Sequence, residues 1–350
     1  MDFDERIKKV ENILKEKKVA IAFSGGADST MVAYLANKVC DDTLAITFNN
    51  EIMPSTFLNA GKEIAKSIGI QQEIINQDFL DIEEFKENKS NRCYLCRNIM
   101  YSSIKKLAEE RGFETIVDGT NISDLLEDRP GIMVNYENNI LSPLVNGGIE
   151  KEEVVEFLNK ENIKYSKSTT CLATRIKTGE KISSKKINRI NYAENLLKNL
   201  TKDDTVRVRD ISDTAQIEVR DLDPLLNKNT LKLIESELKA VNFEKITIDI
   251  GTTITEKKEI VIYKPCKDEA NKIMFENELP YEIDIPKTCL HLKKIGKVKC
   301  SEKMGVAMMD INGRNITLFK NGKIVARKVK DKEDAQNILI EVLPLIRRVI

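Results

Sequence analysis

The sequence contains no tryptophan and a single histidine, His291, among its 350 residues. A histidine base would have to be that one residue, and we interpret it as a surface or packing side chain. The chain lacks an apolar run of about 18 residues and a signal-peptide pattern, which predicts a cytoplasmic protein without membrane partners. It also lacks an excess of charge, because 56 basic residues balance 56 acidic ones. We therefore do not expect nucleic acid as a partner.

Seven cysteines are present without a secretory signal. An odd number of thiols in that context favours reduced cysteines, a metal site or a catalytic thiolate over a disulfide framework. Cys266, Cys289 and Cys300 lie close together near the C-terminus. We interpret these three as packing residues, with a second metal site or a sulfur-accepting role as alternatives.

Residues 19–29, VAIAFSGGADS, carry the clearest local pattern. An apolar run stops at two glycines and an amphipathic run begins at Met31, which predicts a buried strand, a tight turn and a helix. Glycines let the backbone approach a ligand closely, and the N–H groups of the turn and the first helical turn favour an anion. The spacing is not the GxGxxG of dinucleotide-binding sites. It is also not the phosphate loop of kinases and GTPases, because no Gly-Lys-Ser/Thr follows the glycines. The predicted phosphate ligands are Ser24, Gly25, Gly26 and Ser29, Thr30 adds a further hydroxyl donor, and the predicted Mg²⁺ ligand is Asp28.

Strands alternate with helices up to residue 121. This order predicts an α/β fold with a doubly wound parallel sheet and helices on both faces. Ligands bind at the carboxyl ends of such strands, which brings the glycine loop together with Thr47 and Gly119. The predicted strands are 19–23, 43–48, 70–75 and 115–121, and the predicted helices are 2–17, 31–39, 55–69 and 94–111.

The rest of the chain predicts a smaller α+β region and a small α+β appendage. A long hydroxyl-rich stretch, 165–184, surrounds Cys171, and a loop of that length is usually functional. Asn-Gly pairs at 312–313 and 321–322 predict two hairpins. The predicted domains are 1–148, 149–255 and 256–350. The predicted helices are 149–160, 185–200, 229–243 and 332–348, and the predicted strands are two within 206–220, then 245–250, 305–311, 314–320 and 323–328.

Cys93 and Cys96 form a Cys-x-x-Cys pair. This spacing suits half of an iron–sulfur or zinc site, a redox pair, or two structural cysteines. Zinc would need further ligands, for which the C-terminal cysteines and His291 are the candidates. The residues alone leave these alternatives open.

The hexapeptide SGGADS resembles the SGGxDS loop of the PP-loop ATP pyrophosphatases, which cleave ATP between its α- and β-phosphates. Further phrases resemble, in order and spacing, the LarE-type ATP-dependent sulfur transferases. The resemblance covers roughly residues 1–255 and implies an adenine nucleotide α-hydrolase-like fold with ATP and Mg²⁺ as cofactors. The phrases are NRCYLCR (91–97), DGTNISDLLEDRPG (118–131), SPL (142–144), CLATRI (171–176) and VRVRDISDTAQIEV (206–219).

The resemblance implies a reaction in two halves. A carboxylate of a pyridinium mononucleotide attacks the α-phosphate of ATP and pyrophosphate leaves; sulfur then displaces AMP from the acyl carbon. A carboxylate is already a nucleophile, so no protein base is needed, which agrees with the shortage of histidine. Sulfide or a sulfur donor protein would supply the sulfur, and we expect a homo-oligomer.

The resemblance also implies a sulfur source. Members with three cysteines that match Cys93, Cys96 and Cys171 bind a [4Fe-4S] cluster, in which one iron has no protein ligand and carries an extra sulfide. In other members a single cysteine that matches Cys171 gives up its own sulfur and becomes dehydroalanine. We expect the cluster, with sacrificial transfer by Cys171 and zinc or plain thiols as alternatives.

The family's substrate-binding residues match five positions here. Arginines would hold the phosphate and carboxylate by bidentate bonding, and two glutamates lie in the same pocket. The chain departs from the family at Thr174 and at 177–179, where serine and Pro-Tyr-Gly are usual, which leaves the acceptor's identity open. A tRNA thiolase and a sulfur or cluster carrier are the alternative functions. The matching residues are Arg175, Arg207, Arg209, Glu194 and Glu218.

Overall fold

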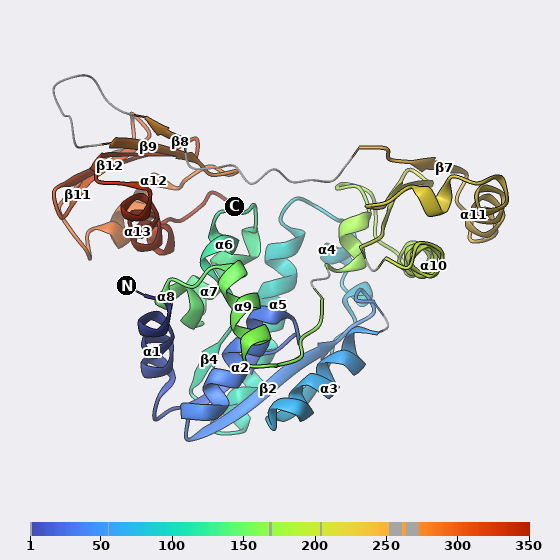
Figure 1. Cartoon of the computed structure of the whole chain (residues 1–350), viewed down its shortest axis with the longest axis horizontal. Helices are drawn as coiled ribbons and strands as arrows, with labels where there is room; N and C mark the ends of the chain where they lie inside the picture. The colour runs from blue at the N-terminus through green and yellow to red at the C-terminus, as the bar shows by residue number, and fades with distance from the viewer. Residues whose placement is uncertain (1, 55, 168–169, 204, 252–260, 264–272) are drawn as a thin grey trace.

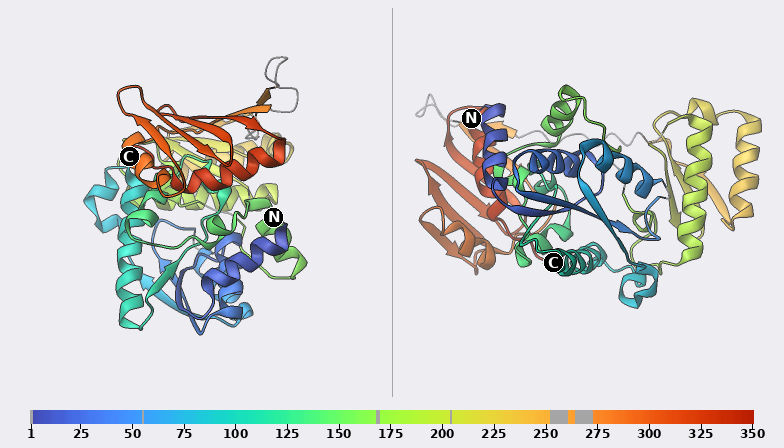
Figure 2. Two further views of the ribbon diagram at one scale, coloured as in Figure 1. Left: turned by 90° about the vertical axis from the view of Figure 1, so that its left-hand side faces the viewer. Right: turned by 90° about the horizontal axis from the view of Figure 1, so that it is seen from below.

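The computed structural model describes residues 2–54, 56–167, 170–203, 205–251, 261–263 and 273–350. Three β-sheets organise these described residues, and each carries its own helices (Figure 1). The second and third sheets lie at opposite ends of the N-terminal part (Figures 1 and 2). Among the described helices, none has the length and apolar character needed to cross a bilayer.

The N-terminal sheet is entirely parallel, with the strand order β3-β2-β1-β4. Its two central strands are runs of apolar residues that are buried on both faces, as parallel strands between helix layers must be. The predicted doubly wound α/β fold is confirmed. The strands are β1 (Lys18–Ala22), β2 (Asp42–Asn49), β3 (Gln71–Asn76) and β4 (Thr115–Val117).

Helices cover both faces of this sheet (Figure 2). On one face, apolar side chains of α1, α2, α3, α8 and α9 form one core with β1. On the other face, α5 and α7 pack against the central strands. The helices are α1 (Phe3–Leu14), α2 (Ala27–Val39), α3 (Phe57–Ile68), α4 (Glu83–Lys86), α5 (Arg92–Glu110), α6 (Ile122–Leu125), α7 (Met133–Glu137), α8 (Pro143–Gly147) and α9 (Lys151–Lys160).

The second sheet has the order β5-β6-β7 and packs against two helices, α10 and α11. Its core also takes in Phe79 and Phe85 from the N-terminal part and Leu172 from the segment around Cys171. The segment that was predicted to be an irregular loop is therefore anchored at the start of the second region. The elements are η3 (Leu172–Arg175), α10 (Ser184–Thr201), β5 (Arg207–Ile211), β6 (Thr214–Glu218), α11 (Lys228–Ala240) and β7 (Lys245–Ile248).

The third sheet is antiparallel, with the order β10-β11-β12-β13-β9-β8. The two hairpins predicted at the Asn-Gly pairs are confirmed, whereas β8, β9 and β10 were not predicted. The predicted helix 332–348 is wrong at its end: α13 stops at Val342 because Pro344 lacks the N–H that the next turn needs. The elements are β8 (Val261–Tyr263), β9 (Ile273–Glu278), α12 (Ile285–Leu292), β10 (Val298–Ser301), β11 (Val306–Ile311), β12 (Arg314–Phe319), β13 (Lys323–Val329) and α13 (Lys332–Val342).

The C-terminal region shares a hydrophobic core with the N-terminal part. Ile122, Leu125 and Ile132 pack in one cluster with the inner face of the third sheet, and Ile338 of α13 belongs to the same cluster. α13 covers the small sheet. The predicted boundary at 256 lies outside the described residues, and the division into three domains stays a prediction.

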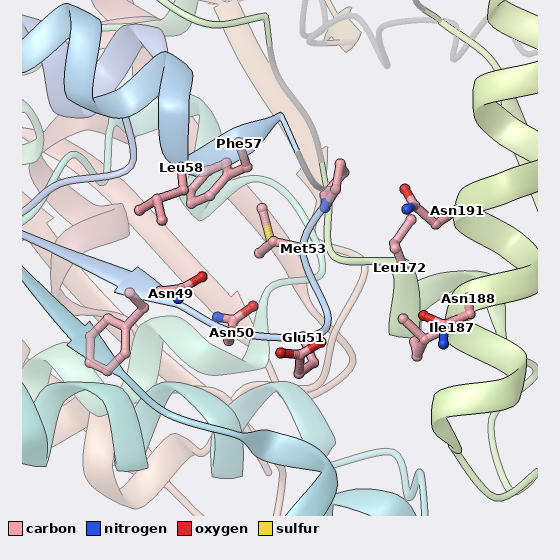
Figure 3. Close-up of a pocket in the computed structure, with 12 residues that line it drawn as sticks. Asn49, Asn50, Glu51, Met53, Phe57, Leu58, Leu172, Ile187, Asn188 and Asn191 are labelled. Carbon is pink, nitrogen blue, oxygen red and sulfur yellow. The ribbon is translucent and has the colours of Figure 1, made fainter.

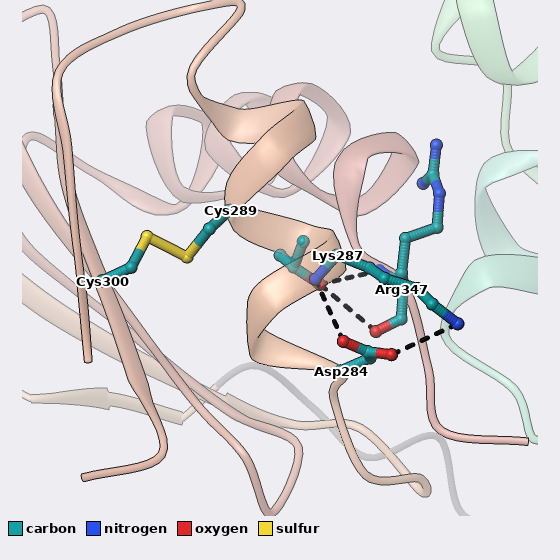
Figure 4. The surroundings of a disulfide bond; sticks show 6 residues. Asp284, Lys287, Cys289, Cys300 and Arg347 are labelled. Atoms are coloured by element: carbon teal, nitrogen blue, oxygen red, sulfur yellow. Dashed lines mark hydrogen bonds and ion pairs between the residues drawn. A yellow bond between two sulfur atoms is a disulfide. The ribbon is translucent and has the colours of Figure 1, made fainter. Parts of the chain in front are cut away.

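A disulfide joins Cys289 of α12 to Cys300 of β10 (Figure 4). The preference for reduced cysteines was therefore wrong for this pair. The helix packs against the edge of the sheet so that the two Cα atoms are 6.4 Å apart, within bonding range. The pair is thus not available as zinc ligands or as sulfur acceptors in this state. Cys266 lies outside the described residues.

Candidate functional site

The glycine loop, residues 24–29, joins β1 to α2 at the carboxyl edge of the first sheet. Gly25 has a φ of +73°, and a Cβ there would lie 3.0 Å from the Gly61 Cα, so only glycine fits without strain. The Gly26 N–H donates to Ser24 Oγ at 3.2 Å, and the hydroxyls of Ser24 and Ser29 are 3.0 Å apart. Gly26 caps α2 without a side chain. The N-terminus of α2 is thus left open for an anion such as a phosphate.

Two buried hydroxyl oxygens beside this loop have no hydrogen-bond partner within the described part of the chain. They are Thr30 Oγ1 and Ser166 Oγ. The backbone places Ser166 at the loop, since its N–H donates to the Gly25 carbonyl at 2.7 Å. Sequence reasoning missed Ser166, because only long-range pairing brings it to the glycines. Both hydroxyls suit a polyphosphate that supplies acceptor oxygens.

Asp28 lies in the first turn of α2, where its Oδ1 accepts a hydrogen bond of 2.8 Å from Asn121 Nδ2. Burial raises the pKa of Asp28, although Asn121 and nearby Lys151 and Arg129 oppose the shift. A divalent cation would restore the charged form. No group of three His, Cys, Asp or Glu side chains in the described ranges is gathered to hold a metal ion. Mg²⁺ would therefore depend on phosphate oxygens and water in addition to Asp28.

The other two predicted nucleotide residues support the loop from behind. A Cβ at Gly119 would lie 2.6 Å from the Ser29 N, so Gly119 lets β4 pack directly against the start of α2. The buried Thr47 hydroxyl donates to the Phe23 carbonyl at 2.9 Å and accepts from Gln72 Nε2 at 2.7 Å. Thr47 thus holds the strand that leads into the loop.

A network of buried polar groups fixes α5 to the end of β4, beside Gly119. Arg97 of α5 forms an ion pair with Asp118, and the Tyr101 hydroxyl donates to the same carboxylate at 2.9 Å. Burial alone would raise the pKa of Asp118, but Arg97 and hydrogen bonds from Thr120 and Ser142 outweigh it and lower the pKa. The helix that carries Cys93 and Cys96 is therefore held rigidly against the sheet.

The segment that carries Cys171 spans the carboxyl edge of the first sheet. At one end the Ser166 N–H bonds to Gly25, and at the other the Leu172 N–H donates to the Ile52 carbonyl at 2.7 Å. Cys171 stands between these two anchors as the residue that precedes η3. These two backbone bonds bring the segment around Cys171, which is distant in sequence, to the nucleotide edge.

The thiols of Cys93, Cys96 and Cys171 are all free, and they are close enough to affect one another's pKa. Burial raises the pKa of Cys96, and the thiols of Cys171 and Cys93 raise it further. Burial also raises the pKa of Cys171, against the opposing effect of Arg92. As they stand, the three thiols are not gathered into a metal-binding group within the described chain. Their ligation of a cluster stays a prediction.

The family-matched arginines and glutamates form two ion pairs. Arg175 Nε donates to Glu194 Oε1 at 2.7 Å, and both side chains are buried. Arg209 pairs with Glu218 across β5 and β6, whereas Arg207 is exposed. Arg175 Nη1 also donates to Thr170 Oγ1 at 2.6 Å, next to Cys171. The Arg175 pair therefore supports the thiol segment, and Arg207 remains accessible to a ligand.

A pocket of about 200 Å³ lies between the end of β2 and α10 (Figure 3). Figure 3 shows Asn49 and Asn50 on the β2 side of the pocket, with Leu172 and Asn188 facing them from the second region. Asn50 Oδ1 is buried without a partner in the described structure. Sequence reasoning missed this pocket. Two asparagines directly after a buried strand could have indicated it, because ligands bind at the carboxyl ends of parallel strands.

Comparisons with known proteins agree with this geometry. The model of the PP-loop domain family matches residues 1–177. An uncharacterized protein of Methanocaldococcus jannaschii is 32% identical over 255 residues, which cover 71% of this chain and 98% of that protein. The pyridinium-3,5-bisthiocarboxylic acid mononucleotide synthase of Lactiplantibacillus plantarum is 26% identical over 241 residues, 67% of this chain and 86% of that enzyme.

A solved structure also matches: the U34-tRNA thiolase NcsA from Methanococcus maripaludis with its [4Fe-4S] cluster. It shares 21% identity and a TM-score of 0.38, and it covers 56% of this chain and 72% of that one, so no inference about chemistry rests on it. The family model and the sequence relatives establish the family without this structure. The chain belongs to the PP-loop family of ATP pyrophosphatase-type enzymes, in the part of that family that includes sulfur transferases.

Proposed function

We propose that this protein adenylates a carboxylate of a small nucleotide-like acceptor and then transfers sulfur to the activated carbon. In the first half the carboxylate oxygen bonds to the α-phosphorus of ATP and the bond to pyrophosphate breaks. In the second half a sulfur nucleophile bonds to the acyl carbon and AMP leaves with the electron pair of the broken C–O bond. One ATP is converted to AMP and pyrophosphate for each sulfur that is transferred.

One observation carries the proposal: the segment with Cys171 is bonded to the glycine loop on one side and to the exit of β2 on the other. The residue that follows it, Leu172, lines the pocket at that edge. A thiol is therefore next to the place where ligands bind in an open parallel sheet. This supports sulfur delivery to a group that is activated in the same site.

The adenylation half is supported by the groups around the glycine loop. The open N-terminus of α2 and the hydroxyls of Thr30 and Ser166, which have no partner among the described residues, would bind the phosphates as charge moves onto the pyrophosphate. Asp28 would hold Mg²⁺ there. Backbone N–H groups cost no reorganisation during the reaction, which suits a leaving group with several charges.

The sulfur half is assigned to Cys93, Cys96 and Cys171. Three free thiols from two elements suit a soft metal, so the donor chemistry fits a [4Fe-4S] cluster, which would supply a bound sulfide. The side chains are not gathered into a metal site as they stand, and we derive no step through a cluster. Ultraviolet-visible and Mössbauer spectra of anaerobically purified protein test it: absence of iron after reconstitution excludes the cluster and leaves Cys171 as the donor.

The acceptor is proposed from the exposed Arg207 and the polar pocket. Arginine binds carboxylate and phosphate by bidentate bonds, and the asparagines offer donors and acceptors to a ring substituent. A pyridine mononucleotide with a ring carboxylate has this chemistry. A probable tRNA sulfurtransferase of Methanobrevibacter smithii is 29% identical over 157 residues, which makes tRNA the second candidate acceptor.

Pyrophosphate release under anaerobic conditions tests the proposal. Release should require ATP, Mg²⁺ and the carboxylated mononucleotide, and Asp28→Asn should reduce the rate by about 10²-fold or more because the metal is lost. Asp41→Asn, at an exposed position outside the loop, is the matched control and should be unaffected. Release that depends on tRNA instead would establish the second acceptor. A chain that releases no pyrophosphate with either one contradicts the proposed reaction.

A further inference from the structure

Two buried residues outside the predicted site connect the thiol-bearing elements. Asn88 lies between α4 and α5, is fully buried and has a φ of +54°. Arg92 is the first residue of α5 and is also buried. Neither residue contacts the glycine loop by a hydrogen bond that the structure describes. Both residues instead donate hydrogen bonds to the segment 173–180, directly after Cys171.

The Asn88 side-chain amide nitrogen and its backbone carbonyl both bond to that segment. Its Nδ2 donates to the carbonyls of Lys177 at 2.8 Å and Glu180 at 2.9 Å. Its backbone carbonyl accepts from the Gly179 N–H at 2.9 Å. Asn88 Oδ1 accepts from Arg92, so the two side chains act as a unit. Asparagine adopts this left-handed conformation more readily than most other non-glycine residues, so the backbone at position 88 also suits it.

Arg92 extends this unit to both sets of thiols. Its Nη1 donates to the Ala173 carbonyl at 3.1 Å, two residues after Cys171. Its Nη2 lies 3.8 Å from Cys93 Sγ. The planar guanidinium therefore bridges the first turn of α5 and the start of η3. A lysine ammonium carries the same charge but lacks the planar set of donors that makes both contacts.

We propose that Asn88 and Arg92 are positioning residues that hold the Cys171 segment against the first turn of α5, so that the three thiols stay within reach of one another. This inference rests on the proposed function, because it explains how thiols from distant parts of the chain serve one transfer. Release of the segment would lower the effective concentration of Cys171 at Cys93 and Cys96 without a change in the glycine loop.

Oxidative trapping in the full-length protein tests the inference. Diamide takes two electrons from two thiols that meet, and peptide mapping identifies disulfides between Cys171 and Cys93 or Cys96. Asn88→Gly removes the side-chain bonds and tolerates the positive φ. We expect this variant to form the disulfide about tenfold more slowly than the wild type. ATP binding should not change, whereas a general loss of folding would reduce it.

Two further variants complete the test. Arg92→Lys keeps the charge and should also slow trapping. Asn162→Gly is the matched control, because Asn162 is an exposed residue with a φ of +55°, and this variant should trap at the wild-type rate. Unchanged trapping in both Asn88→Gly and Arg92→Lys overturns the positioning role. A wild-type chain that fails to trap Cys171 with either thiol also overturns it, whereas the proposed function fails on the absence of pyrophosphate release, so the two failures are distinguishable.

Discussion

The glycine loop and the thiol neighbourhood are two halves of one proposed site that are built in opposite ways. The loop is six consecutive residues whose backbone supplies the N–H groups proposed to bind phosphate. The thiols come from α5 and from a segment far along the chain, and buried side chains hold these parts together. A contiguous motif carries its geometry in local backbone conformation, whereas a composite site depends on the packing of regions. The loop should therefore be sensitive to steric changes, and the thiol side to lost hydrogen bonds and charges.

The largest effect on ATP-dependent pyrophosphate release should come from a steric change behind the loop. Gly119→Ala places a Cβ 2.6 Å from the Ser29 N, so α2 has to shift away from β4. We expect loss of ATP-dependent pyrophosphate release and a decrease of about 1–3 kcal/mol in the free energy of unfolding. Urea unfolding and a pyrophosphate assay measure the two effects.

Gly61→Ala is the matched control for this change. The new Cβ would meet nothing closer than 3.9 Å, and alanine favours the helix, so stability should not decrease. If Gly119→Ala retains the wild-type rate, the loop does not need the close packing of β4.

On the thiol side, the largest effect should come from Arg175→Ala. This change leaves Glu194 buried without its cation, and we expect a loss of about 3–5 kcal/mol in the free energy of unfolding. Replacing both residues, as in Arg175→Met with Glu194→Leu, should recover most of that loss. Chemical denaturation of the single and double variants completes the cycle. Full stability with lost turnover would instead assign Arg175 to substrate binding, as the resemblance implied.

A smaller effect is expected from Asp124 of α6, which lies near Asp28 of the glycine loop and pairs with Arg129. Burial raises the pKa of Asp124 to about 6, with nearby Asp28 adding to the shift and Arg129 opposing it. The folded state therefore holds a proton that the unfolded chain releases near pH 4, so this contribution to stability is present at low pH and is lost as the pH rises through 6.

Asp124→Asn should remove this dependence. The difference in unfolding free energy between wild type and variant should change by about 2–3 kcal/mol between pH 4 and pH 7, in favour of the variant at the higher pH. Urea unfolding at both pH values measures it. A constant difference would show that the folded protein does not retain the proton.

The smallest effect on stability is expected at Arg207. Because this side chain is exposed, Arg207→Ala should change the free energy of unfolding by less than about 0.5 kcal/mol. The KM for the acceptor should rise severalfold while the KM for ATP stays the same. Arg209→Ala is the comparison, since it leaves the buried Glu218 without its partner and should destabilise more. Equal KM values in wild type and Arg207→Ala would remove Arg207 from the acceptor site.

The contrast between the two halves also explains what the sequence predicted. The parallel sheet and its helices follow from local apolar runs, glycines and caps, and both Asn-Gly hairpins form where their turn chemistry indicates. Helix ends were less certain, because a proline such as Pro344 stops a helix that apolar spacing alone would extend.

Contacts between distant segments could not be predicted from one sequence. Ser166 reaches the glycine loop through backbone pairing with a distant segment, and nothing in its sequence neighbours indicates it. Asn88 resembles any polar loop residue until its partners are known. The Cys289–Cys300 bridge likewise depends on how α12 packs on β10.

The central claim is that one site both adenylates a carboxylate and delivers sulfur to it. Anaerobic incubation with ATP, Mg²⁺, sulfide and a carboxylated pyridine mononucleotide, followed by mass spectrometry of the acceptor and of the Cys171 peptide, tests it most directly. The account predicts an acceptor with one oxygen replaced by sulfur and one AMP per sulfur, with Cys171 intact if sulfide is the source and converted to dehydroalanine if it is not. An acceptor that is unchanged while AMP accumulates would contradict the claim.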